Sequence, residues 1–322
     1  MSDSRLVTAA DVHAAHDAIA GRVRRTPMSG SSQLSERLGV DVRLKLELFQ
    51  NTGSFKVRGA LNRMLQLSAA ERARGVVCPS AGNHAQAVAW AARETGTRAT
   101  VVMPTGAVRS KIDATRGYGG DVVLIDGDLL DAASAMQHER GLVMVHPFDD
   151  PAVIAGAGTI GNEILDDVPD ADLILVGVGG GGLLSGIAVA VQARRPAARV
   201  IGVEPQGAAA MRLSLDHGRP MRLDRMSTIA DGLSAPRAGT LTFAHVRALG
   251  LEIVTVPDSA IVQAMWLTME RCKLFAEPAA AAGLAALLSG AVQVPRGARV
   301  VCVVTGGNVD RERLMALAAL PS

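Results

Sequence analysis

One lysine in the chain stands in a context that suits chemistry better than solvation. Lys56 follows the turn 52–54 and Phe55, and it precedes a predicted apolar helix. An amine held at a helix start inside a cleft can lose its proton by desolvation and react with an aldehyde. The ordinary alternative is a lysine on a solvated face. The chain has few lysines to compare, and the others are Lys45, Lys111 and Lys273.

A run of consecutive glycines predicts a phosphate site. Residues 179–182 follow an apolar strand predicted over 173–178 and precede a helix predicted over 183–193. Glycine lets the backbone approach a ligand closely, and the N–H groups at a helix N-terminus bind anions. A tight turn alone would not offset the entropic cost of so many glycines. The loop therefore predicts a phosphate cradle.

The same loop also fits a nicotinamide dinucleotide. Gly177, Gly179 and Gly182 satisfy the G-x-G-x-x-G spacing, and Glu204 ends the next predicted strand. An acid at that place binds the ribose in dinucleotide folds. An NAD-dependent oxidoreductase using residues 177–182 is therefore an alternative from another functional class.

Two further loops carry polar residues after predicted strands. Residues 80–86 lie between a strand and a helix, so their free N–H groups could hold a substrate carboxylate. Asn83 could equally be a plain N-cap, and His84 a histidine satisfied within the first turn. Thr305 opens the glycine turn 305–308, and its hydroxyl could meet a ring nitrogen.

The elements that must position these loops alternate between strand and helix. Strands predicted at 76–78, 99–103 and 122–125 are each followed by a predicted helix, and a second series starts at residue 173. This alternation predicts an α/β fold with two doubly wound parallel-sheet lobes and a cleft between them. We assign residues 69–149 to a small domain, and residues 1–68 and 150–322 to a discontinuous large domain.

Composition narrows the class of protein. The chain has 322 residues, 48% hydrophobic and 20% charged, with a formal net charge of +2. A near-neutral charge gives no indication of nucleic acid or an anionic membrane as the main partner. The three cysteines are far apart, so neither a disulfide framework nor a zinc site is expected. No leader or membrane segment is visible, and we expect a cytoplasmic protein.

Taken together, these loops resemble the threonine dehydratase and serine racemase family. This family belongs to the tryptophan-synthase-β-like class of pyridoxal-phosphate enzymes. The likeness rests on four segments in the family's order, which are 54–60, 80–86, 179–182 and 305–308. Residues 147–151, 230–233 and 277–278 also resemble the family. Four ordered motifs are more specific than one glycine fingerprint, so they outweigh the nicotinamide alternative.

The resemblance implies a role for each matching residue toward pyridoxal 5'-phosphate. Lys56 would bind the cofactor covalently, and Phe55 would pack near its ring. Asn83 would bind the ring hydroxyl oxygen, and Thr305 would meet the ring nitrogen. The phosphate would be bound by backbone N–H groups of Gly179, Gly180, Gly181, Gly182 and Leu183.

The resemblance also implies the substrate and the reaction. A small β-hydroxy amino acid would bind through Ser80, Ala81, Asn83 and His84 while the small domain closes over it. The expected activity is dehydration of L-threonine, L-serine or both to a 2-oxo acid and ammonia. A serine racemase is the alternative within the family. Racemases of this family carry a second serine where this chain has Ala81, so dehydration is favoured.

Some relatives of this kind bind a divalent cation near the position of Glu204, with help from a second acid. Residues 207–211 contain no carboxylate here, so we expect no metal site. A fold that serves only as a binding module is a further alternative. The presence of Lys56, Asn83 and the glycine loop together argues against it. We expect a homodimer or a higher homo-oligomer.

Overall fold

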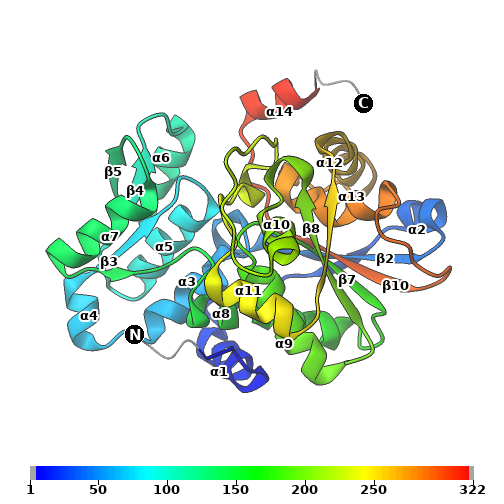
Figure 1. Cartoon of the computed structure of the whole chain (residues 1–322), viewed down its shortest axis with the longest axis horizontal. Helices are drawn as coiled ribbons and strands as arrows, with labels where there is room; N and C mark the ends of the chain where they lie inside the picture. Colours follow the sequence, from blue (N-terminus) through cyan, green and yellow to red (C-terminus); the bar gives the residue numbers. More distant parts are fainter. Residues whose placement is uncertain (1–4, 319–322) are drawn as a thin grey trace.

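The computed structural model describes residues 5–318, which form two sheets surrounded by helices (Figure 1). The larger sheet has six strands in the order β1-β2-β10-β7-β8-β9. All neighbouring pairs are parallel except β1 with β2. Its strands are β1 (Met28–Gly30), β2 (Asp41–Leu46), β10 (Arg299–Val304), β7 (Leu173–Gly177), β8 (Arg199–Pro205) and β9 (Glu252–Val256).

The smaller sheet has four parallel strands in the order β5-β4-β3-β6. They come from one continuous stretch of chain, whereas the larger sheet joins strands from both ends of the sequence. The strands are β3 (Val76–Pro79), β4 (Ala99–Pro104), β5 (Asp121–Ile125) and β6 (Val143–Met144). Their helices are α4 (Ala69–Arg74), α5 (Asn83–Glu94), α6 (Arg109–Gly117) and α7 (Leu129–Arg140).

Both faces of each sheet are buried, as a doubly wound fold requires. In β7, Leu173 and Leu175 pack into one core while Ile174 and Val176 pack into another. In the smaller sheet, Val77 belongs to a different core from its neighbours in β3. The predicted α/β class with two parallel-sheet lobes is confirmed, with the antiparallel edge strand β1 as an addition.

The remaining helices surround the larger sheet or connect it to the smaller one. The first, α1, begins at a capping box, in which Thr8 and Asp11 exchange hydrogen bonds. The helices are α1 (Ala9–Ile19), α2 (Ser32–Leu38), α3 (Lys56–Leu65), α8 (Pro151–Asp167), α9 (Gly182–Arg194), α10 (Ala210–His217), α11 (Thr240–Ala248), α12 (Asp258–Cys272), α13 (Ala282–Leu288) and α14 (Arg311–Ala318).

Helix α8 lies at the centre of the helix packing and contacts both α3 and α9. A Cβ atom on Gly156 would lie 2.6 Å from the Arg58 carbonyl oxygen. A Cβ atom on Gly158 would lie 2.7 Å from the carbonyl oxygen of Gly186 in α9. Such approaches need glycine, because any side chain would overlap the facing backbone. Helix α3, which begins at Lys56, is thereby held against a rigid support.

A buried charge cluster anchors the same helix. Arg58 donates to Glu47 and to Glu163, with N–O distances of 2.7–2.9 Å. Lys45 Nζ donates to Glu163 at 2.6 Å and to the Thr26 carbonyl at 2.7 Å. All four charged side chains are at most 4% exposed. Removing one member would leave a buried charge unpaired, which is strongly destabilising.

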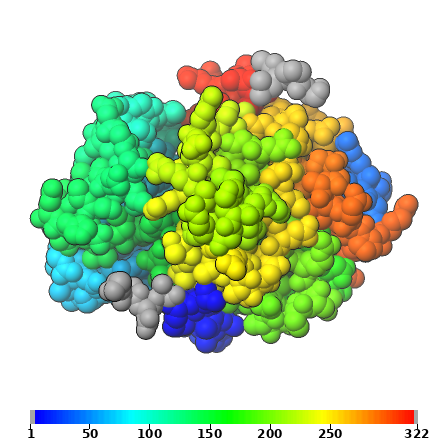
Figure 2. Space-filling model, in the orientation of Figure 1, coloured from blue at the N-terminus to red at the C-terminus, as the bar shows by residue number. Residues whose placement is uncertain are grey.

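The two sheets lie side by side, and the residues of the smaller sheet form one end of the molecule (Figure 2, cyan and green). Segment 220–237 of the larger part reaches toward it, and Arg222 contacts Asp128 at 3.2 Å. Within residues 5–318, no helix has the length and apolar character needed to cross a bilayer.

Candidate active site

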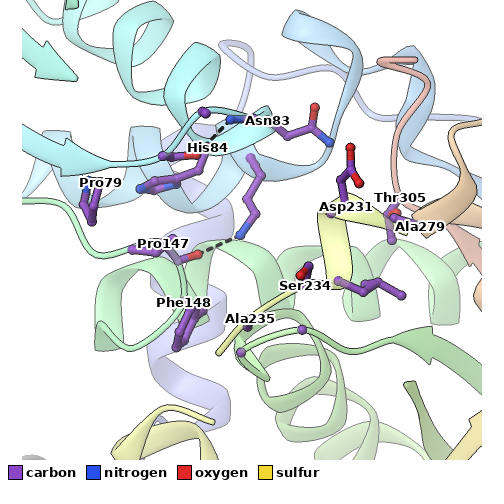
Figure 3. A pocket seen from close by; sticks show the side chains of 18 of the residues that line it. Pro79, Asn83, His84, Pro147, Phe148, Asp231, Ser234, Ala235, Ala279 and Thr305 are labelled. Carbon is purple, nitrogen blue, oxygen red and sulfur yellow. Dashed lines mark hydrogen bonds between the residues drawn. The ribbon is translucent and has the colours of Figure 1, made fainter. Parts of the chain in front are cut away.

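A cavity of about 800 Å³ lies between the two sheets (Figure 3). Its walls come from the loops that follow β3, β7 and β10, so it lies at the carboxyl ends of parallel strands. Ligands of open α/β sheets bind at such edges. Every site residue predicted from the sequence lines this cavity, namely Phe55, Lys56, Ser80, Ala81, Asn83, His84, Gly179, Gly180, Gly181, Gly182, Leu183 and Thr305.

Lys56 occupies the first position of α3 and reaches into the cavity. Its Nζ donates to the Pro147 carbonyl oxygen at 2.7 Å and lies 5.1 Å from the centre of the Phe55 ring. Desolvation lowers the pKa of Lys56 to about 8, although the negative charge of Glu277 acts in the opposite direction. A large fraction of the amine is therefore neutral near pH 8 and can act as a nucleophile or base.

The glycine loop forms the N-terminus of α9 opposite the lysine. Gly181 is the N-cap with φ +96°, and a Cβ atom there would lie 2.7 Å from Met211 Cε. The Gly180 carbonyl accepts from the Thr242 hydroxyl at 2.6 Å. Because the peptide is trans, this bond turns the N–H of Gly181 in the opposite direction. The loop thus presents unpartnered N–H groups at a helix N-terminus, as a phosphate needs.

Phe148 and Leu233, which line the cavity, pack against the glycine loop. A Cβ atom on Gly180 would overlap the Phe148 ring, and one on Gly182 would lie 2.8 Å from the Phe148 carbonyl oxygen. A Cβ atom on Gly179 would lie 3.3 Å from the Leu233 backbone. Glycine is therefore required sterically at positions 180 and 182, whereas the approach at Gly179 is tight but less severe.

The loop 80–84 forms the opposite wall, at the N-terminus of α5. The Gly82 N–H donates to the Ser80 hydroxyl at 3.1 Å, which shapes the turn, and α5 begins at Asn83. The N–H groups of the first helical turn have no partner within the helix and can bind a carboxylate. Ala81 lies in the same turn and lines the cavity with a methyl group.

The His84 ring is buried and neutral. Its Nε2 lies 2.9 Å from the Val145 carbonyl oxygen, so this nitrogen carries the proton. Burial lowers the pKa of His84 to about 3, and its Nδ1 is buried without a partner. The side chain is therefore neutral at physiological pH and cannot form an ion pair with a substrate carboxylate.

Thr305 and Glu277 close the far end of the cavity. Thr305 is labelled in Figure 3. Its backbone carbonyl oxygen accepts a hydrogen bond from the N–H of Phe55 at 3.1 Å. Glu277 accepts from the side chain of Asn83 at 2.8 Å, and burial raises the pKa of its carboxyl to about 7. This bond joins Asn83 of α5, beside the smaller sheet, to the segment that follows α12 in the larger part.

Glu204 lies away from the cavity and is already occupied. Its two carboxylate oxygens accept from the N–H groups of Met211 and Arg212, each at 2.8 Å, so it caps helix α10. The side chain is fully buried, and burial raises its pKa to about 7. A ribose could not reach this carboxylate, which counts against the nicotinamide alternative.

Several cavity residues were not assigned a role from the sequence. Phe148, Leu233 and Glu277 were noticed only as parts of family-like segments, and Asn308 only as part of a glycine turn. His146 was not noticed at all, although its Nδ1 accepts from the N–H of Asp149 at 2.9 Å. The contacts of Phe148, Leu233, Glu277 and Asn308 join segments far apart in the chain, so no local pattern indicates them.

Comparisons with known proteins point to one family. The sequence model described as "Pyridoxal-phosphate dependent enzyme" matches residues 19–306. An L-threonine ammonia-lyase of Thermotoga maritima is 45% identical over 95% of this chain and 76% of its own length. Among solved structures, maize serine racemase superposes with a TM-score of 0.92 at 37% identity, covering 97% of each chain. The T.th. threonine deaminase gives a TM-score of 0.88 at 40% identity, covering 94% of this chain and 99% of its own.

Proposed function

Because the chain belongs to the pyridoxal-phosphate dependent enzyme family, we propose that it is a dehydratase, or ammonia-lyase, for L-threonine, L-serine or both. The observation that carries this proposal is the opposition of Lys56 and the glycine loop across one cavity. A small molecule that carries both an aldehyde and a phosphate can react with Lys56 and bind the glycine loop at the same time. The relatives include an L-threonine ammonia-lyase, a threonine deaminase and a serine racemase, so the substrate is a small β-hydroxy amino acid.

The residues present fit pyridoxal phosphate. Backbone N–H groups of Gly179, Gly180, Gly181, Gly182 and Leu183 would hold the phosphate, because they lie at the N-terminus of α9 beside the cavity, where the first N–H groups have no partner within the helix. Phe55 would lie near the ring, Thr305 would meet the ring nitrogen and Asn83 the ring hydroxyl oxygen. When bound, the cofactor supplies an electron sink for the electron pair left at the substrate Cα.

The protein's own groups supply binding and proton transfer. The N–H groups of the first turn of α5, with Ser80 and Asn83, bind the substrate carboxylate and fix the direction of Cα. The neutral amine of Lys56 removes the Cα proton. Loss of the β-hydroxyl as water and later hydrolysis give a 2-oxo acid and ammonia. Thr305 offers a neutral hydroxyl rather than a carboxylate, which disfavours a protonated ring nitrogen and hence transamination.

Elimination is proposed over inversion because of Ala81. A racemase needs a second proton donor on the face of Cα opposite Lys56. Ala81 lines that loop with a methyl group, which has no exchangeable proton. The similarity to maize serine racemase makes inversion the second candidate.

We further propose that residues 69–149 move as a domain that closes over the substrate. Support comes from the small number of polar contacts that cross the cavity entrance, such as Arg222–Asp128.

A homo-oligomer in the cytoplasm is also proposed. Free thiols at Cys78, Cys272 and Cys302 support a reducing compartment. The exposed Phe49 and Phe275 side chains support contact with a second copy of the chain.

The experiment combines cofactor mapping with a product assay. The purified protein is expected to be yellow, and borohydride should fix the pigment onto the peptide that contains Lys56. L-threonine and L-serine should release 2-oxo acid and ammonia faster than they invert. A colourless protein that binds a nicotinamide dinucleotide would overturn the proposal. A yellow protein that inverts serine faster than it releases ammonia would favour the racemase.

A further inference from the structure

Asn308, which ends the loop after β10, has no role in the proposed function. Its side-chain nitrogen lies 2.8 Å from the Thr52 carbonyl oxygen and 2.8 Å from Oδ1 of Asn83. The side-chain nitrogen of Asn83 lies in turn 2.8 Å from Oε1 of Glu277. These bonds form one chain that starts at a backbone carbonyl and ends at the cavity.

The order of donors and acceptors along this chain is fixed from its start. A backbone carbonyl can only accept, so the Asn308 group beside Thr52 must be the NH₂. Its second hydrogen points to Asn83, which must present its oxygen there. The NH₂ of Asn83 is therefore turned toward Glu277 and the cavity. One hydrogen serves Glu277, and the other is free for a ligand.

The turn that supplies the starting carbonyl is held in an unusual conformation. Thr52 has φ +60°, which among residues 5–318 is shared by Lys273 alone of the non-glycine residues. Gly53 follows with φ +72°, and a Cβ atom on it would lie 2.5 Å from Oδ1 of Asn308. A threonine in the left-handed region is strained, and such strain persists where surrounding contacts impose it.

The turn and the loop are also joined through their backbones. The Gly307 N–H donates to the Gly53 carbonyl at 3.0 Å, and the Phe55 N–H donates to the Thr305 carbonyl at 3.1 Å. The loop that carries Asn308 therefore sets the position of the turn before Lys56 and the direction of Asn83 together.

We propose that Asn308 is a positioning residue that fixes the Asn83 amide as a hydrogen-bond donor to the ring hydroxyl oxygen of pyridoxal phosphate. This inference rests on the proposed function, because it needs the cofactor ring beside Asn83. With the amide reversed, the Asn83 oxygen would face both Glu277 and the ring oxygen. Two acceptors would then oppose each other at a buried site, which is unfavourable.

The test replaces Asn308 by aspartate, which has the same shape and only acceptors. Asn308→Asp should reverse the Asn83 amide, whose NH₂ would turn to the new carboxylate. The dissociation constant of the apoprotein for pyridoxal phosphate is then expected to rise about tenfold, measured by equilibrium absorbance titration. Asn51→Asp is the matched control. It makes the same chemical change in the neighbouring turn that contains Thr52, at a side chain that donates to the Arg22 carbonyl outside the cavity.

A second probe separates the lost hydrogen bond from added negative charge. The 3-deoxy analogue of pyridoxal phosphate lacks the ring hydroxyl, so Asn83 has no ring oxygen to bind. Its dissociation constants for wild type and Asn308→Asp should agree within about twofold, as a coupled pair in a thermodynamic cycle requires. The absorption maximum with the natural cofactor should also shift in Asn308→Asp and not in Asn51→Asp.

Asn308→Ala covers the case in which the aspartate variant does not fold. Alanine removes the Asn308 NH₂ but supplies no acceptor that would turn the Asn83 amide around. The dissociation constant for pyridoxal phosphate should therefore rise only about threefold. If the variant that folds binds pyridoxal phosphate and its 3-deoxy analogue with equally weakened affinity, the positioning role is overturned. The same holds if that variant binds pyridoxal phosphate as tightly as the wild type does. If the wild-type protein binds no pyridoxal phosphate at all, the proposed function itself fails.

Discussion

The reactivity of Lys56 depends on the water that its surroundings exclude. Burial lowers its pKa from 10.5 to about 8, so the neutral amine becomes abundant at a lower pH than in free lysine. We predict that the rate of pigment formation from apoprotein and pyridoxal phosphate rises with pH and levels off above about 8. Stopped-flow absorbance against pH measures this. A rate that still climbs at pH 10 would contradict it.

The same pKa has a consequence for stability, with a definite sign. Between pH 8 and 10.5 the unfolded lysine binds a proton that the folded lysine does not. The free energy of unfolding of the apoprotein should therefore rise with pH over that window. Lys56→Met should remove this part of the slope, as urea denaturation at several pH values would show.

Ala81 offers a second prediction at the level of a single side chain. Ala81→Ser places a hydroxyl in the loop that faces the substrate carboxylate, and a hydroxyl can exchange a proton with Cα. Inversion of L-serine should rise relative to elimination, measured as D-serine against pyruvate. The companion Ala107→Ser is the control, since its position is outside the residues lining the cavity. An unchanged ratio in Ala81→Ser would mean that another group controls that face.

Residue types alone identified the chemistry but not every contact. The loops that contain Asn83, the glycines and Thr305 could be found because each follows a predicted strand, and Lys56 because it precedes a predicted apolar helix. Lys45 shows where this reasoning stops, since its place in the sequence indicates no partner. In the structure Lys45 is fully buried beside Glu163. That partner is 118 residues away in the sequence, and no local pattern indicates it.

At the level of elements, the packing of α8 against α9 depends on glycine. A Cβ atom on Gly186 would lie 2.6 Å from the backbone nitrogen of Gly158. We predict that Gly186→Ala lowers the free energy of unfolding by about 2–3 kcal/mol, because the helices must separate. Gly117→Ala in α6 is the control, since nothing lies within 4 Å of its Cβ position.

In the control, alanine should be neutral or stabilise by about 0.5–1 kcal/mol, because it restricts the unfolded chain. Urea denaturation of both apoproteins measures the difference. Equal effects from the two substitutions would show that the close approach of α8 and α9 is relaxed at little cost.

The strand-then-helix order of these elements could be predicted from the periodicity of the sequence. The close contacts of their glycines could not be predicted. A glycine within a helix ordinarily lowers helix stability, and its packing role appears only when the neighbouring helix is known.

At the level of the whole molecule, few polar contacts cross the entrance of the cavity. Arg222 pairs with Asp128 at 3.2 Å, and Lys111 pairs with Asp231 at 3.7 Å. Each pair has one side chain that is at least 61% exposed, so each contributes about 0.5 kcal/mol. We predict that Arg222→Ala raises KM for L-threonine about twofold at low salt, an effect that shrinks as ionic strength rises.

Arg109→Ala is the matched control for that experiment. Arg109 pairs with Asp113 within α6 and so makes a comparable exposed ion pair that does not cross the entrance. Steady-state kinetics at two salt concentrations compares the variants. An equal change in KM from both substitutions would attribute the effect to net charge rather than to contacts across the cavity.

The pairing of β2 with β10 has a consequence for how the molecule is made. The register joins Asp41–Leu46 to Arg299–Val304, so β2 reaches β7 only through a strand near the end of the chain. A ribosome completes the smaller sheet long before it releases β10. Strands β1 and β2 are joined through helix α2, and until β10 is made β2 keeps an open edge, which invites non-native pairing. The N–H of Phe55, next to Lys56, donates to the Thr305 carbonyl beside this junction, so a nascent chain cannot complete its reactive centre before the loop after β10 is made.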